Sequence, residues 1–428
     1  MSAHTALILL LDLAVIAGAA RILGVAARRV GQPAVIGEIL GGILLGPTLF
    51  GGALTRTLFP AEVRPSLTLL ADIGVAVFMF LVGLELDRNL LRGQGRIASG
   101  VALSAIVVPF ALGALLALYL LGHHPSHQRA AFILFLGTAM SVTAFPVLAR
   151  ILTDRGLLRT PIGALALACA SLDDVLAWSL LAVVAALAGG AAGPWQIALI
   201  IPFAALLLLV VRPVLARLAA RAEAGGWPRN RVVARLGAAA IVVAAAGGLW
   251  LSAMATQWMG LHLIFGAFLF GVAMPRGHGM RLRERTLPWV GRICSNLLLP
   301  VFFMVAGLTV DLSRIDGTAL GELGLILLVA IGGKGIGAFA GARLCGVRTR
   351  HSAVLAVLIN TRGLTELIVL TVGLQLHVLD TGLYSLMVVM ALVTTAMTGV
   401  MLQIIYPEQR ARADLAPRTA ISEPEATL

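Results

Sequence analysis

The chain has 428 residues, of which 59% are hydrophobic and only 12% are charged, and its mean hydropathy is +0.98. Such a composition excludes a soluble domain and predicts a protein that crosses a membrane many times. The net charge of +12 does not point to nucleic acid, because the arginines fall in short clusters between apolar runs, as membrane topology requires.

Apolar runs close to the ~20 residues that a membrane-spanning helix needs recur along the whole chain. We therefore expect an all-α polytopic protein with about thirteen transmembrane helices, centred on residues 5–27, 34–50, 67–86, 97–121, 130–152, 162–187, 197–218, 232–254, 261–274, 287–308, 320–344, 353–376 and 383–406. The first run lacks a basic segment before it, which favours a retained span over a cleaved signal peptide. Residues 408–428 are polar and predict a disordered cytoplasmic tail.

The loops between these runs alternate between arginine-rich and arginine-poor. The rich loops include Arg28, Arg92, Arg155, Arg217, Arg283 and Arg348, whereas the poor loops carry Arg56, Arg64, Arg129 and Arg314. The positive-inside rule then places the amino terminus outside and the carboxyl terminus in the cytoplasm.

The chain also contains an internal repeat. Residues 77–87 (VFMFLVGLELD) resemble 301–311 (VFFMVAGLTVD), and the Gly-Pro pattern of 36–47 resembles that of 265–275. The equivalent spans are about seven helices apart, and because seven is odd the two halves should have opposite orientations. Such inverted repeats are typical of secondary transporters; chance similarity between glycine-rich apolar runs is the alternative.

The repeat defines the expected organisation of the chain. We expect a first six-span repeat over 1–192, a linking span and cytoplasmic loop over 193–229, a second six-span repeat over 230–407, and the tail over 408–428.

Two adjacent carboxylates, Asp173 and Asp174, lie in the middle of the apolar run 161–187. A charge at the bilayer centre costs roughly 2.5–3.5 kcal/mol on insertion scales, so the pair should have a function, a partner or both. A buried carboxylate must hold either protons or a cation, and this is a basis for exchanging one for the other. An intramembrane aspartyl protease needs its two aspartates on different helices, so adjacent residues argue against that enzyme.

A helix break is expected at 141–146 (SVTAFP) in the fifth span. Pro146 removes a backbone donor and disfavours helix at the residue before it. Ser141 and Thr143 are able to solvate the freed backbone or a cation, so the functional interpretation is an ion site lined by a broken helix. The alternative is an ordinary proline kink.

The corresponding place in the second repeat is 360–366 (NTRGLTE), where Asn360, Thr361 and a glycine interrupt an apolar run. A pair of interrupted spans in matching positions points to a site between two discontinuous helices. Arg362 and Glu366 are four residues apart on one helical face, and we favour a structural role in which they neutralise each other.

Lys334 is the only lysine in the chain, and it lies near the middle of the span 320–344. Arginine stays charged at any working pH, whereas a buried lysine can lose its proton. We expect Lys334 to pair with Asp173 and to titrate; snorkelling to the membrane interface is the alternative. Adjacent helical residues point about 100° apart, so one aspartate can face Lys334 while the other faces the broken helices.

Several weaker signals remain open. His123, His124 and His127 lie in one loop, which we interpret as a solvated loop rather than a pH sensor or a metal site. Glu38 and Asp72 lie in or near spans, where they could line a funnel or pair locally. The three cysteines have no paired spacing and predict neither a disulfide framework nor a metal site.

These motifs together resemble the monovalent cation:proton antiporter superfamily, and in particular bacterial relatives of plant cation/proton exchangers. The resemblance lies in residues 141–152, in the Asp173-Asp174 core up to Trp178 and in 360–370, with further support at 37–47 and 80–87. It covers nearly all of residues 1–407.

The resemblance implies an inverted-repeat fold with a dimerisation domain and a core domain that moves as an elevator. It further implies that Asp174 binds the cation, that Asp173 pairs with Lys334, and that crossed broken helices surround Thr143 and Gly363. Members with two aspartates are generally similar to electrogenic exchangers. The short tail does not match the regulatory domain of glutathione-gated members, so we expect no gating of that kind.

We therefore expect a homodimer among membrane lipids that exchanges Na⁺ or K⁺ for protons, with no enzymatic activity and no cofactor. Asp174 would be the shared ligand of cation and proton, and Thr143, Ser141 and nearby backbone would complete the ion's shell. The alternative is a cation channel or leak pathway, in which cation flux is not coupled to protons.

Overall fold

The computed structural model describes residues 3–49, 52–85, 95–126, 128–157, 160–188, 199–224, 231–259, 261–275, 288–313 and 316–406, so the tail expected at 408–428 lies outside the described part. The described elements are all helices, which confirms the all-α expectation. Each of the thirteen apolar runs contains helix.

Eight described helices are long and apolar enough to cross a membrane, and a pair bent by 44° raises the number to nine. The eight cover Leu7–Arg29, Arg64–Leu84, Arg96–Leu120, Pro161–Ala188, Ile200–Arg217, Pro288–Leu308, Gly317–Leu344 and Thr381–Ile405, and the bent pair is Thr349–Ile359 with Leu364–Gln375. Three shorter apolar helices are Ala34–Leu45, Arg129–Ser141 and Leu263–Ala273. The protein is therefore a multi-pass membrane protein.

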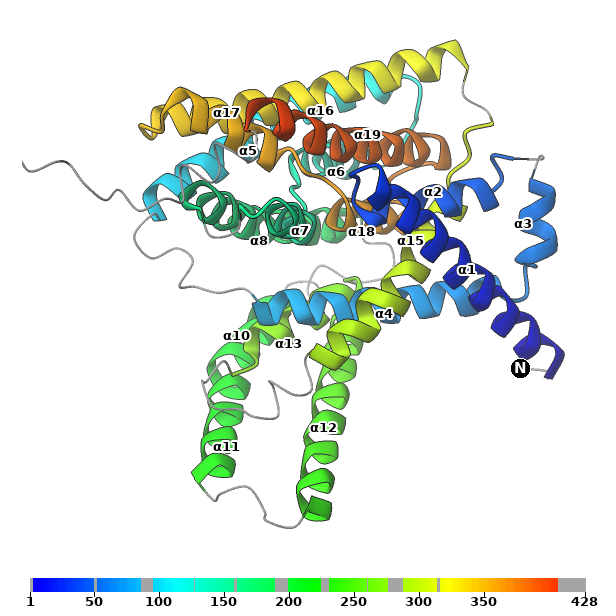
Figure 1. The fold of residues 1–428 in the computed structure, drawn as a ribbon, viewed down its shortest axis with the longest axis vertical. Helices are drawn as coiled ribbons and strands as arrows, with labels where there is room; N and C mark the ends of the chain where they lie inside the picture. The colour runs from blue at the N-terminus through cyan, green and yellow to red at the C-terminus, as the bar shows by residue number, and fades with distance from the viewer. Residues whose placement is uncertain are drawn as a thin grey trace, which may run out of the picture.

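The helices separate into two bundles (Figure 1). The site bundle consists of α5 (Gly95–Leu120), α6 (Arg129–Ser141), α7 (Phe145–Asp154), α8 (Pro161–Ala188), α16 (Gly317–Leu344), α17 (Thr349–Ile359), α18 (Leu364–Gln375) and α19 (Thr381–Ile405). The companion bundle contains α1 (Ala3–Arg29), α2 (Ala34–Leu45), α3 (Ala53–Leu58), α4 (Arg64–Glu85), α10 (Ile200–Ala205), η3 (Leu206–Val211), α11 (Arg212–Ala224), α12 (Arg231–Trp258), α13 (Leu263–Ala273), η4 (Cys294–Leu298) and α15 (Leu299–Leu308).

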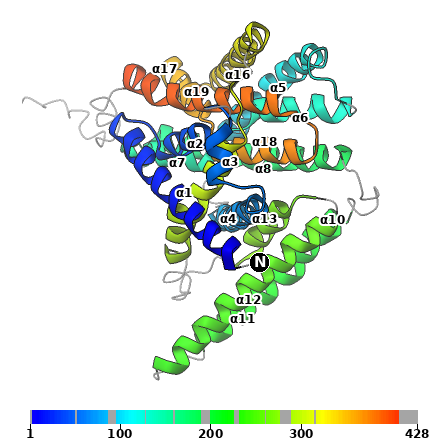
Figure 2. The same cartoon turned by 90° about the vertical axis from the view of Figure 1, so that its right-hand side faces the viewer.

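Extensive helix packing stays within one bundle or the other among the described residues. Between the bundles runs a shared apolar core, in which Val75 of α4 belongs to the same cluster as Leu136 of α6 and Leu386 of α19. The turned view shows α11 and α12 projecting away from the rest of the molecule (Figure 2).

Two close glycine contacts in the companion bundle reflect the repeat seen in the sequence. A Cβ added to Gly42 of α2 would lie 2.7 Å from the Cα of Gly307 on α15, and one added to Gly271 of α13 would lie 3.1 Å from the Cα of Gly83 on α4. The sequence repeat equates Gly42 with Gly271 and Gly83 with Gly307. Each contact therefore becomes the other when the two halves are exchanged, which agrees with a structural repeat; the inverted orientation of the halves stays a prediction.

The largely buried His124, in the turn after α5, bonds to two other helices of the site bundle. The His124 side chain is 16% exposed; its Nδ1 lies 2.5 Å from Asp380, which caps α19, and its Nε2 lies 3.1 Å from Glu322 of α16. Because ionised carboxylates only accept hydrogen bonds, both ring nitrogens donate and the imidazole is charged. The hydrogen bond to Asp380 is the main cause that raises the pKa of His124 to about 9.

The expectation of a solvated loop is therefore wrong for His124, because two partners distant in sequence enclose it. His123 is 42% exposed and lies 3.5 Å from Glu322, whereas His127 lies outside the described residues. The three cysteines are free thiols.

We expect the stabilisation from His124 to depend on pH. Its pKa rises from 6.5 to about 9 on folding, so the stabilisation is complete below about pH 6.5 and is lost as the pH rises through about 9. His124→Gln should lower the apparent melting temperature by about 1–2 °C near pH 6, for ~1 kcal/mol of lost hydrogen bonding, and leave it unchanged near pH 10. Thermal melts in detergent measure this, with the exposed His4→Gln as control. An equal drop at both pH values would contradict a charged His124.

Candidate functional site

In two places in the site bundle a short, buried, non-helical segment separates two consecutive helices. The first interruption, residues 142–144, separates α6 from α7, and the second, residues 360–363, separates α17 from α18. Pro146 lies in the first turn of α7, a position that proline favours at the start of a new helix. Gly363 has φ 148°, a conformation that favours glycine, immediately before α18. In both places several consecutive residues are not helical, whereas a simple proline kink would leave the helix continuous. The expectation of broken helices is therefore confirmed.

The two interruptions touch each other. The Ala144 N–H donates to the Thr361 carbonyl at 2.9 Å, and the Thr143 hydroxyl donates to the Ile359 carbonyl at 2.9 Å. Non-helical backbone inside a membrane is tolerated only where protein or water satisfies it. At this crossing each break supplies partners for the other.

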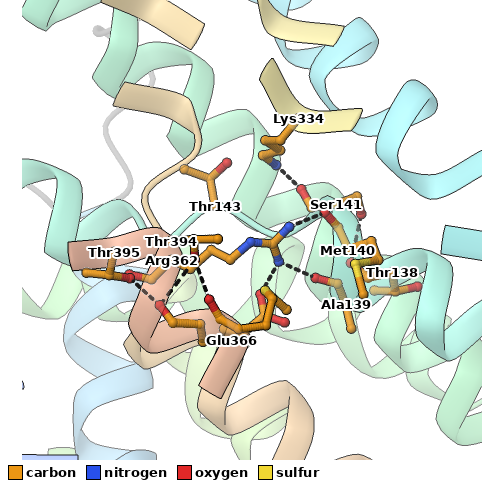
Figure 3. Close-up of polar contacts among 12 residues, drawn as sticks. Thr138, Ala139, Met140, Ser141, Thr143, Lys334, Arg362, Glu366, Thr394 and Thr395 are labelled. Atoms are coloured by element: carbon orange, nitrogen blue, oxygen red, sulfur yellow. Dashed lines mark hydrogen bonds and ion pairs between the residues drawn. The ribbon is translucent and has the colours of Figure 1, made fainter. Parts of the chain in front are cut away.

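The last four carbonyls of α6, residues 138–141, would be without intrahelical partners in a helix that ends inside the protein. The first accepts from the Ser141 hydroxyl at 2.8 Å, and the second and third accept from Arg362 at 2.7 and 2.6 Å. The fourth accepts from Lys334. Figure 3 shows both cationic side chains reaching this helix end, which their charge suits because the carboxyl end of a helix is negative.

Arg362 is also paired within its own segment. It lies 2.7 Å from Glu366, both side chains are fully buried, and its carbonyl accepts from the Thr395 hydroxyl of α19 at 2.7 Å. The expected structural pairing of Arg362 with Glu366 is confirmed. Its contacts with α6 were not foreseen, because no local pattern in the sequence shows which distant helix end a buried arginine reaches.

Lys334 of α16 pairs with Asp173 of α8 at 2.9 Å. The lysine is fully buried, which excludes snorkelling to the interface, and its pairing with Asp173 is confirmed. Asp173 also lies beside the Thr143 hydroxyl, so the ion pair adjoins the first break. Asp174 is buried next to this pair, with 2% of its surface exposed.

Several buried oxygen atoms around the crossing have no hydrogen-bond partner within the described part of the chain. They are Oδ1 of Asp173, Asp174 and Asn360, Oγ1 of Thr361 and Oε1 of Glu366. Carboxylate, amide and hydroxyl oxygens are the ligands that hard cations prefer. The described residues contain no cluster of three His, Cys, Asp or Glu suited to a bound metal, so a cation here would rely on few carboxylates and on neutral oxygens.

Of the other polar residues noted in the sequence, two lie at the first break and two lie in the companion bundle. Ser141 and Thr143 lie at the first break, and each hydroxyl donates its proton to a carbonyl, which leaves oxygen lone pairs as acceptors. Glu38 and Asp72 lie half-buried on α2 and α4 in the companion bundle, apart from the crossed breaks.

Crossed discontinuous helices with a buried carboxylate–ammonium pair define a membrane transporter fold. Residues 13–406 match the family described as sodium/hydrogen exchanger, transmembrane, and the chain belongs to that family. The resemblance expected from the sequence is thereby confirmed.

Individual relatives cover the chain almost completely. It is 39% identical over 421 residues to the Na⁺/H⁺ antiporter NhaS4 of Synechocystis, which covers 95% of this chain and 99% of that protein. It is 40% identical over 425 residues to cation/H⁺ antiporter 20 of Arabidopsis thaliana (94% and 49%), and 32% identical over 397 residues to K⁺/H⁺ antiporter 1 of Saccharomyces cerevisiae (88% and 44%). The chain thus spans about half the length of these plant and yeast relatives.

A solved structure shares the fold. The sodium proton antiporter MjNhaP1 from Methanocaldococcus jannaschii matches with a TM-score of 0.64 and 15% sequence identity, covering 96% of this chain and all of that chain.

Removing one partner of the buried ion pair should cost more stability than removing both. Lys334→Met leaves the Asp173 charge uncompensated, which typically costs ~3–5 kcal/mol, whereas an apolar replacement of the whole pair is often nearly neutral. We expect Lys334→Met to lower the melting temperature strongly, and Lys334→Met with Asp173→Leu to recover much of the loss. Thermal unfolding in detergent measures these variants together with Asp173→Leu alone. If the loss of stability in the double variant equals the sum of the losses in the two single variants, the two side chains are not coupled.

Replacement of Arg362 by lysine should destabilise the protein. A guanidinium donates in a fixed fork to two carbonyls and a carboxylate, whereas an ammonium on a different stem cannot reproduce that geometry. We expect Arg362→Lys to leave at least one buried carbonyl of α6 unsatisfied, at ~1–3 kcal/mol, and so to lower the melting temperature. The control is Arg350→Lys, whose guanidinium lies over the Tyr406 ring at the end of α19 and should matter less. Equal effects of the two substitutions would count against the role of Arg362 at the helix end.

Proposed function

We propose that the protein is a secondary active transporter that exchanges a monovalent cation, Na⁺ or K⁺, for protons. The observation that carries the proposal is the buried Asp173-Asp174 pair beside two crossed helix breaks, with only one of the two carboxylates bonded to Lys334. Family membership supports it, as do the names of relatives that are antiporters of Na⁺, of K⁺ and of unspecified cations. No cofactor enters the proposal.

Asp174 is the proposed shared ligand. Asp173 already has a cationic partner at 2.9 Å, whereas Oδ1 of Asp174 is buried without a partner in the described chain. An uncompensated charge in a low-dielectric site costs several kcal/mol, so Asp174 should be occupied by either a proton or a cation whenever it is closed off from water. If only these neutralised forms pass between the two access states, exchange is obligatory.

The oxygens around the crossing would complete the ion's shell. Thr143, Thr361 and Asn360 offer neutral oxygens at the two breaks, and Ser141 offers another at the end of α6. The positive charges of Arg362 and Lys334 are directed at the carbonyls of α6. In this proposal those cations hold the helix end in place, and the transported cation interacts with Asp174.

We further propose a homodimer in the plasma or inner membrane, with the amino terminus outside and the carboxyl terminus in the cytoplasm. The support for this orientation is the alternation of arginine-rich and arginine-poor ends. In the described part, Arg28, Arg155 and Arg348 mark one end of the helices and Arg56, Arg64 and Arg129 mark the other.

The test is proton movement in proteoliposomes with an imposed pH gradient, to which Na⁺, K⁺ and Li⁺ are added in turn. We expect at least one cation to dissipate the gradient, and Asp174→Asn to abolish the effect, because an amide neither binds protons nor carries charge.

Asp72→Asn is a matched control, since it changes a half-buried carboxyl of the companion bundle. Retained exchange in Asp174→Asn would contradict the assignment of Asp174. Cation flux without proton movement would replace the antiporter with a channel.

A further inference from the structure

Among the described residues, the hydrogen bonds between the two bundles lie mainly at one end of the helices. Near the end marked by Arg56, Arg64 and Arg129, which we call the arginine-poor face, three hydrogen bonds join the site bundle to the companion bundle. The Tyr384 hydroxyl donates to the Ala306 carbonyl at 3.1 Å, the Asp311 N–H donates to the Ser385 hydroxyl at 3.0 Å, and His262 Nε2 lies 2.8 Å from Gln375 Oε1.

The opposite, arginine-rich face differs. There, within the described residues, one hydrogen bond joins the bundles: the Gln32 side chain donates to the Ala396 carbonyl at 3.4 Å. This bond is longer than each of the three at the arginine-poor face.

Between the two ends, the interface is apolar. Trp178 of α8 meets Phe265 of α13 edge to face, with ring centroids 6.3 Å apart. Apolar contacts have little directional preference, so they allow one bundle to slide along the other. Hydrogen bonds require a fixed geometry and therefore select one relative position of the bundles.

At the arginine-poor face, local hydrogen bonds orient the side chains of His262 and Ser385 for their bonds between the bundles. Nδ1 of His262 accepts from the Ile264 N–H at the start of α13, so in the neutral ring Nε2 carries the proton and donates to Gln375. The Ser385 hydroxyl donates to the Thr381 carbonyl at 2.8 Å, which leaves its lone pairs for the Asp311 N–H.

We propose that these three bonds form a polar latch, Tyr384–Ala306, Ser385–Asp311 and His262–Gln375, which closes the arginine-poor face and must break before the site bundle can move. The latch deepens the proposed transport function and rests on it. The latch bonds two segments that follow the crossed breaks, the end of α18 and the start of α19, to the companion bundle.

A reversible cross-link tests the latch. In a protein whose three natural cysteines are replaced by serine, His262→Cys and Gln375→Cys are joined by a short bifunctional thiosulfonate, and exchange is measured before linking, after linking and after reduction. We expect exchange in the unlinked pair, loss of at least tenfold in rate after linking, and recovery on reduction.

The matched control is Thr48→Cys with Leu312→Cys. These residues also bond to each other near the arginine-poor face, but both belong to the companion bundle, so linking them should leave exchange intact. Undiminished exchange after linking His262→Cys to Gln375→Cys would overturn the latch. Absence of exchange in the parent and in every unlinked variant would instead refute the proposed transport function.

A second readout does not depend on transport. Tyr384→Phe removes one latch bond and keeps the ring, so the unlatched state should become roughly five- to tenfold more populated. Hydrogen–deuterium exchange should then be faster in the first turns of α19 and at the end of α15. Thr394→Val, which removes a hydroxyl that bonds within α19 in the site bundle, is the control. Unchanged deuterium uptake in Tyr384→Phe would overturn the latch even if transport is absent.

Discussion

The structure depends on how a helix can end inside a membrane protein. The last four carbonyls of α6 point into a buried region where no backbone donor of the helix is available. Lys334 of α16, Arg362 of the second break and the hydroxyl of Ser141 satisfy them. Lys334 then pairs with Asp173, and Arg362 pairs with Glu366. The helix break, the two buried cations and the two buried carboxylates therefore form one network, in which each charge has a structural reason to be present.

This network also explains why the two aspartates differ. Asp173 shares Lys334 with the end of α6, so its position is fixed by groups that hold the helix break together. Asp174 lies one position further along α8 and takes no part in those bonds within the described structure. A residue without a structural partner in a buried site is free to exchange one ligand for another, and the proposed function assigns that role to Asp174.

Much of this arrangement could be predicted from the sequence. Apolar runs of membrane-spanning length gave the helical segments, Pro146 and Gly363 gave the breaks, and the isolated Lys334 gave the pairing with Asp173, because each signal is local or unusual in its surroundings. The contacts of Arg362 with α6 and of His124 with Asp380 and Glu322 were not predictable, since nothing in the local sequence around either the histidine or the arginine marks its distant partner. The local pattern around His123 and His124 was even misleading, because a polar loop in sequence can still be enclosed by the helix ends it meets.

The single lysine has a further consequence for the chemistry of the molecule. Every other basic side chain is arginine or histidine, and Lys334 has no exposed surface. Reagents that acylate primary amines therefore find no accessible lysine in the folded protein, although they find one as soon as the site bundle opens. Acylation of the Lys334 Nζ, located by peptide mass so that it is distinguished from acylation of the terminal amine, therefore reports when water and reagent reach the centre of the site bundle.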